Sequence, residues 1–142
     1  MTYSGDLSGF TGTFNVRGGT SATAGTNVID CTSTFGGTFY VDNGNLQIGN
    51  ADTRGSFGNN DIINNGTIIY NRTDSQTYSA NFSGTGALKV NSGTLLLNGV
   101  NTHAGTTTVA ATPPSPAAAA LADQSRCSRA ARWAPGRLLL AR

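Results

Sequence analysis

Residues 82–109 read FSGTGALKVNSGTLLLNGVNTHAGTTTV, and this stretch decides the fold class. It contains three short runs, GALKV, GTLLLNG and TTTV, which follow an alternating pattern of apolar and other residues and are bounded by Gly, Asn or Ser. Strict alternation predicts β-strands that bury one face only. Turn residues recur about every six to eight positions, which predicts a tightly coiled path. Such a pattern is typical of a repeated structural unit rather than of a catalytic pocket.

A second repeat lies nearer the N-terminus. Residues 10–16, FTGTFNV, and residues 35–41, FGGTFYV, agree at five of seven positions when Phe10 is aligned with Phe35. Self-similarity at a period between about 20 and 50 residues indicates a solenoid, whose stacked turns share one core. The sequence therefore predicts an all-β domain over residues 1–112, folded as a right-handed parallel β-helix.

One alternative fold has the same composition. The pairs Asn43-Gly44 and Asn65-Gly66 suit the type I′ turns that join antiparallel strands in hairpins. Hairpins at these positions would give an antiparallel β-sandwich. Periodicity alone does not separate the sandwich from the solenoid, but the repeat that aligns Phe10 with Phe35 favours the solenoid.

The stretch 82–109 also resembles the autotransporter-associated β-strand repeat, or passenger-associated transport repeat, of bacterial passenger domains. His103 stands where that repeat has Tyr, and Thr106 where it has Gly. The matching residues are Gly84, Gly86, Leu88, Lys89, Gly93, Thr94, Leu95, Leu97, Gly99, Asn101, Thr102, Gly105, Thr107 and Val109.

The resemblance implies a surface-exposed segment of a passenger that type V secretion carries through the outer membrane. Its role would be to support export and to serve as an adhesin-like stalk. The implied partner is the parent protein's own outer-membrane translocator barrel, which we expect to lie outside this chain. A surface glycan or host ligand is a further expected partner.

Two sets of structural residues follow from the repeat. Glycines are expected at turns, namely Gly84, Gly86, Gly93, Gly99 and Gly105. Apolar residues are expected to stack inside the solenoid, namely Leu88, Val90, Leu95, Leu97 and Val109, together with Phe14, Val16, Phe39, Val41, Leu46, Ile48, Ile63, Ile68, Tyr70 and Phe82.

Composition separates residues 113–142 from the rest of the chain. Residues 1–112 hold four basic and six acidic side chains, a formal charge of −2, whereas residues 113–142 hold five Arg and one Asp, a charge of +4. A slightly acidic body argues against a nucleic-acid partner, which normally requires a basic patch on the folded domain. Residues 113–142 contain all four Pro and no Thr or Asn.

Two interpretations of this non-β tail compete. It could be a Pro-rich linker followed by a short helix that begins near Ser115-Pro116. Alternatively it is a disordered, out-of-frame translation of a GC-rich gene, because such codons in a shifted frame yield mainly Ala, Arg, Pro and Gly. We favour the second interpretation. The start, MTYSGDLSGF, has neither the basic region nor the apolar run of a secretory signal.

No catalytic, cofactor-binding or metal-binding residue is expected. His103 has no Glu to orient it, and nothing in the pattern brings it to the thiol of Cys31. Residues 58–62, GNNDI, supply one imperfect copy of a calcium motif that needs tandem repetition. Cys31 and Cys127 lie in dissimilar parts of the chain and predict no disulfide.

A carbohydrate-binding or polysaccharide-cleaving β-helix is the alternative function. Asp52, Arg54 and Asp61 lie close together in sequence, and a carboxylate pair beside an Arg could hold a sugar. The same residues also suit a solvated turn, which is the commoner role for such a segment.

Overall fold

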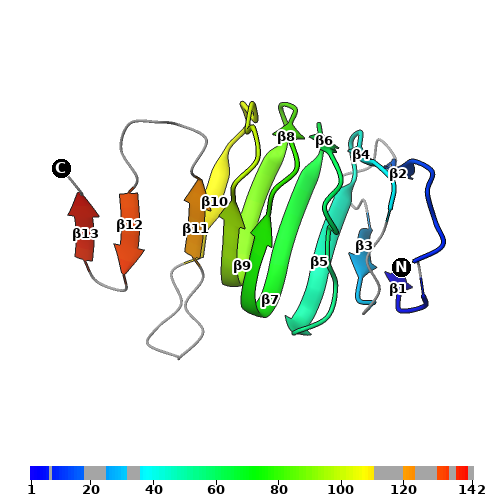
Figure 1. Cartoon of the computed structure of the whole chain (residues 1–142), viewed down its shortest axis with the longest axis horizontal. Helices are drawn as coiled ribbons and strands as arrows, with labels where there is room; N and C mark the ends of the chain where they lie inside the picture. Colours follow the sequence, from blue (N-terminus) through cyan, green and yellow to red (C-terminus); the bar gives the residue numbers. More distant parts are fainter. Residues whose placement is uncertain are drawn as a thin grey trace.

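The computed structural model describes residues 1–6, 8–17, 25–31 and 36–110, and the backbone of residues 120–123, 131–134 and 137–140. These parts of the chain contain β-strands and no helix. The described residues up to residue 110 form a β-solenoid of about four turns, in which parallel sheets run along the long axis (Figure 1). The predicted all-β solenoid fold is confirmed.

Two sheets make up the solenoid. The long sheet has the order β1 (Thr2–Tyr3), β3 (Thr26–Ile29), β5 (Asn45–Asp52), β7 (Thr67–Tyr78), β9 (Ala87–Leu97), β10 (Thr107–Val109). The short sheet has the order β2 (Phe14–Val16), β4 (Phe39–Val41), β6 (Ile62–Asn64), β8 (Phe82–Ser83). From β1 to β9 the chain alternates between the two sheets, so strands that follow each other in sequence lie in different sheets and sheet neighbours lie one turn apart.

The register reproduces the repeat seen in the sequence. Phe14 pairs with Phe39 and Val16 with Val41, which are the residues that the repeat aligns with each other. All pairings within the two solenoid sheets are parallel among the described residues. The segments Asn43-Gly44 and Asn65-Gly66 are corners between a short-sheet strand and the next long-sheet strand, not hairpin turns. The antiparallel β-sandwich is therefore wrong.

Inward-facing side chains from both sheets fill one continuous core. Leu46, Ile68 and Leu88 are register partners in β5, β7 and β9, and all are at most 1% exposed. An aromatic series runs beside this aliphatic row, with ring centroids 5.3–6.1 Å apart, through Tyr3, Phe14, Phe39, Phe57 and Tyr78. Each fully buried side chain of this size stabilises the fold by about 1.5–3 kcal/mol.

One predicted core position is off by a residue. Ile62 is fully buried, whereas Ile63 is 36% exposed, so the prediction that Ile63 faces inward is wrong. The cause is the register: Ile62 is the partner of inward-facing Phe39, and successive residues of a strand point to opposite faces.

Gly93, expected at a turn between strands, lies instead at a bend within one strand. Residues 87–97 form the single strand β9, which bends where its register with β7 shifts. Gly93 lies at this bend with a φ of 77°, a left-handed conformation that favours glycine. The bend carries β9 around a corner without ending the strand.

Three strands occupy parts of the tail for which no β structure was expected. β11 (Ala120–Asp123) pairs in parallel with the second half of β9, and β12 (Ala131–Ala134) pairs with β13 (Arg137–Leu140) in antiparallel fashion. The open edge of β9 offers unpaired N–H and C=O groups that a further strand can satisfy. The predicted helix start at Ser115-Pro116 and the residue Cys127 lie outside the described residues.

Candidate functional site

The structure joins two of the three proposed sugar-binding residues and places the third elsewhere. Arg54 Nε donates to Asp52 Oδ2 at 2.9 Å, and Arg54 Nη2 lies 3.3 Å from Oδ2 of buried Asp30. Hydrogen bonds from the backbone and side chain of Arg54 lower the pKa of Asp52. Asp61 precedes β6, and its Oδ1 accepts the N–H of Asn81 at 3.1 Å. The three residues therefore do not form one site.

A buried ion pair that the sequence did not predict lies near Asp52. Arg72 is 3% exposed, and its Nε and Nη2 each lie 2.7 Å from an oxygen of Asp74. Its guanidinium also donates to the backbone carbonyls of Thr53 and Gly55 in the preceding turn. The hydrogen bonds that Arg72 donates to the Asp74 carboxylate lower the pKa of Asp74. All donors point at groups of the solenoid itself, so this arrangement holds two turns together.

A polar groove runs along the solenoid axis where the chain enters the short sheet. It has a volume of about 390 Å³ and is lined by three tripeptides, Thr11–Thr13, Gly36–Thr38 and Asn59–Asp61. We call it the entry groove. Each tripeptide immediately precedes a strand of the short sheet, β2, β4 or β6.

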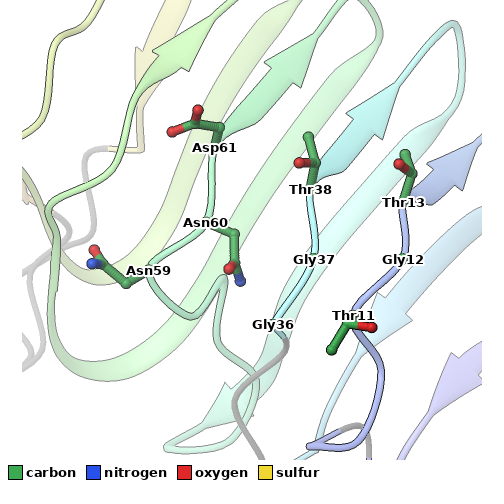
Figure 2. A pocket seen from close by; sticks show the side chains of 9 residues that line it. All are labelled: Thr11, Gly12, Thr13, Gly36, Gly37, Thr38, Asn59, Asn60 and Asp61. Atoms are coloured by element: carbon green, nitrogen blue, oxygen red, sulfur yellow. The ribbon is translucent and has the colours of Figure 1, made fainter.

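Figure 2 shows the three segments of the entry groove side by side. Thr13, Thr38 and Asp61 stand at the base of the three strands, so they occupy equivalent positions on successive turns. Parallel neighbours in a sheet lie about 4.8 Å apart, which sets the spacing of these side chains. Asn60 points toward the neighbouring turn, and its Nδ2 donates to the carbonyl of Phe57 at 3.2 Å.

His103 and Cys31, the two other side chains with reactive groups, pack against other parts of the solenoid. His103 is half-buried, its ring centroid lies 5.0 Å from that of Phe82, and its Nε2 donates to the Gly86 carbonyl at 2.6 Å. Cys31 is 2% exposed within the apolar core. Among the described residues, no three His, Cys, Asp or Glu side chains gather where they could hold a metal ion.

The structural residues expected from the repeat occupy two environments. Leu88, Val90, Leu95 and Leu97 are at most 4% exposed in β9, and Val109 is half-buried in β10. Gly84 has a φ of 108°, and a Cβ on it would lie 2.0 Å from the Asn64 carbonyl of the preceding turn. The remaining expected glycines also approach backbone one turn away: Gly86, Gly93, Gly99 and Gly105.

No helix long and apolar enough to cross a membrane occurs in the described part of the chain.

Comparison with known proteins finds an informative similarity. Over 48 residues, 34% of this chain, the sequence is 46% identical to the adhesin BmaC autotransporter of Brucella suis biovar 1 (strain 1330). The chain spans about 1% of the length of that relative. No family model matches the sequence, and no solved structure matches it. The chain is thus similar over a third of its length to an autotransporter adhesin, and its parallel solenoid fits a passenger segment of that class.

Proposed function

We propose that this chain is a structural segment of an autotransporter passenger, displayed at the bacterial surface as an adhesin-like stalk. The observation that carries the proposal is the stack of parallel turns in strict register. Phe14 to Phe39, Phe39 to Ile62 and Ile62 to Phe82 are successive neighbours in the short sheet. Each turn adds about 4.8 Å along the axis, so a long series of turns makes a spacer.

The arrangement of side chains supports a structural role without catalysis. The hydrogen bonds of Arg72 go to Asp74 and to backbone carbonyls, and His103 donates to the Gly86 carbonyl. Burial raises the pKa of the Tyr70 and Tyr78 phenols, so both stay neutral near pH 7. Both hydroxyls donate to backbone carbonyls of the solenoid.

The proposal includes a role in export. A turn of the solenoid makes most of its contacts with the turns beside it, so folding can propagate from one end as the chain emerges from the membrane. The similarity to an autotransporter adhesin supports a location at the outer surface of the outer membrane.

Surface display tests the proposal. The full chain is fused between a secretory signal and the translocator of a characterised autotransporter, with an epitope tag at its N-terminus. Flow cytometry on intact cells then measures exposure of the tag, and added protease measures folding. We expect display of a protease-resistant core.

Two neighbouring leucines supply the matched variants. Leu95 is fully buried, whereas Leu96 points to the other face of β9 and is half-buried. Leu95→Asp places an unpaired charge in the core and should abolish protease resistance, while Leu96→Asp should retain it. Retention of the unmodified chain inside the cell, or equal behaviour of the two variants, would rule the proposed role out.

A further inference from the structure

We propose that the entry groove binds a neutral oligosaccharide that lies along the solenoid axis. The inference rests on the proposed adhesin-like role and gives that role a ligand class. It replaces the site expected from the sequence, because Asp61 lines the groove and Asp52 and Arg54 do not.

The shape of the groove fits an extended ligand. Its three segments come from three successive turns, so Thr13 and Asp61 lie about 10 Å apart along the axis. This is the span of a short oligosaccharide. Gly12 and Gly36 line the groove without adding side chains to it (Figure 2).

The polar groups match the hydroxyl groups of a sugar. The hydroxyls of Thr13 and Thr38 both donate and accept hydrogen bonds. Asp61 lines one end of the groove, where its Oδ1 accepts the N–H of Asn81 and its carboxylate is turned away from Thr38 (Figure 2), so its second oxygen is placed to accept from a sugar hydroxyl at that end. No Lys or Arg lines the groove, and one carboxylate does. An anionic polymer would therefore meet repulsion, whereas a neutral sugar would meet donors and acceptors.

An apolar surface lies next to the polar one. Phe10 is 41% exposed, and its carbonyl accepts the N–H of Gly36 at 3.1 Å. Its ring lies over Gly12, where an added Cβ would be 3.3 Å from Phe10 Cζ. Sugars present C–H faces as well as hydroxyls, and binding sites combine apolar and aromatic contact with a few placed polar groups.

Titration followed by NMR tests the inference. The ¹⁵N-labelled full chain receives cellohexaose, maltohexaose, mannohexaose or N-acetylchitohexaose, each as a separate probe. We expect at least one of them to shift the amide signals of residues 11–13, 36–38 and 59–61 in a saturable way. Absence of saturable shifts with all four probes, or shifts confined to other residues, would overturn the inference.

Variants then test the assigned groups. Asp61→Asn removes the accepting charge and should weaken binding about tenfold or more. The double variant Thr13→Val, Thr38→Val removes both hydroxyls while keeping β-branched side chains, and should weaken binding to a similar degree. Asp42→Asn, a half-exposed carboxylate in the loop after β4, is the matched control and should bind normally.

The remaining outcomes are also decisive. Unchanged binding by both groove variants would refute the assignment, even if a probe binds. Amide spectra of each variant without sugar show whether it keeps the fold. If Asp61→Asn does not keep it, weaker binding by the Thr13→Val, Thr38→Val variant and by Phe10→Ala supports the assignment, and unchanged binding by both refutes it. A chain that reaches the cell surface but binds no probe would contradict this inference alone and leave the stalk function standing.

Discussion

Arg72 shows how one residue can join two turns of the solenoid. The alkyl part of its side chain packs against Gly49. A Cβ on Gly49 would lie 2.6 Å from Arg72 Cγ, so the lack of a side chain at Gly49 makes room for Arg72. Its guanidinium satisfies carbonyls of the turn below and the carboxylate of Asp74 in its own turn. A buried charge is tolerated in a protein only when it is paired and hydrogen-bonded in this way.

Replacement of Arg72 should therefore destabilise the fold strongly. In Arg72→Leu the Thr53 and Gly55 carbonyls lose their donors, and we expect a loss of about 2–4 kcal/mol in the free energy of unfolding. Urea denaturation followed by far-UV circular dichroism measures it. Arg17→Leu is the control, because the Arg17 side chain is 73% exposed and its ion-pair partner Asp42 is 45% exposed, so its loss should change stability little. Equal effects of the two variants would refute the structural role of Arg72.

The same pair makes stability depend on pH. Because the hydrogen bonds of Arg72 lower the pKa of Asp74, the folded state binds this proton less readily than the unfolded chain does. The stabilisation is fully present above the unfolded pKa of about 3.9 and is lost as the pH falls through the lower, folded value. Asp74→Asn should thus be less stable than the unmodified chain at pH 7, and the difference should shrink below about pH 4. Urea denaturation at both pH values checks this; a constant difference would contradict it.

At the scale of the element, the corners impose the tightest constraints. Gly84 lies at the corner between β8 and β9, and its φ of 108° is one that other residues rarely adopt. The Asn64 carbonyl of the preceding turn leaves no space for a Cβ there. The corner thus depends on glycine both for its backbone conformation and for the closeness of the next turn.

Gly84→Ala should cost about 1–3 kcal/mol in unfolding free energy, because the backbone must shift to admit the methyl group. Gly9→Ala is the matched control, since a Cβ there would meet nothing within 4 Å. Thermal denaturation compares both with the unmodified chain. A Gly84→Ala variant as stable as Gly9→Ala would show that the corner is looser than described.

The strands and their repeat could be predicted because they depend on local patterns. Alternation places Leu95 and Leu97 on one face, and the repeated Phe and Val residues set the alignment of the first two turns of the short sheet. Strand ends were harder to predict. Gly93 was expected to end a strand, but a single left-handed residue bends β9 and lets pairing with β7 continue.

The candidate sites were less predictable because they depend on which turns lie side by side. Asp52 and Asp61 are close in sequence, yet the solenoid places Asp61 next to Thr38 and in the same groove as Thr13, which are far away in sequence. One feature of the sequence could have indicated the Arg72–Asp74 pair. Alternation places Ile68, Tyr70 and Arg72 on the same face of a strand, so the charge of Arg72 points inward.

At the scale of the whole molecule, stacking is what the function requires. Each turn is covered by the next, and the inward rows of aromatic and aliphatic side chains continue from turn to turn. A solenoid of this kind lengthens by adding turns without changing its cross-section. Outward-facing positions, such as Tyr40 in β4 and Ile63 in β6, are then free to vary with the surface that is displayed.

The central claim is that successive turns stack in parallel and in register, and cysteine cross-linking tests it most directly. Tyr40 and Ile63 are outward-facing register partners, at the separation of about 4.8 Å between neighbouring strands, and disulfides bridge Cα atoms about 4.4–6.8 Å apart. With Cys127→Ser as background, oxidation should cross-link Tyr40→Cys, Ile63→Cys rapidly. The pair Tyr40→Cys, Ser83→Cys, two turns apart, should not cross-link. Failure of the first pair, or equal cross-linking of both, would contradict the parallel in-register solenoid.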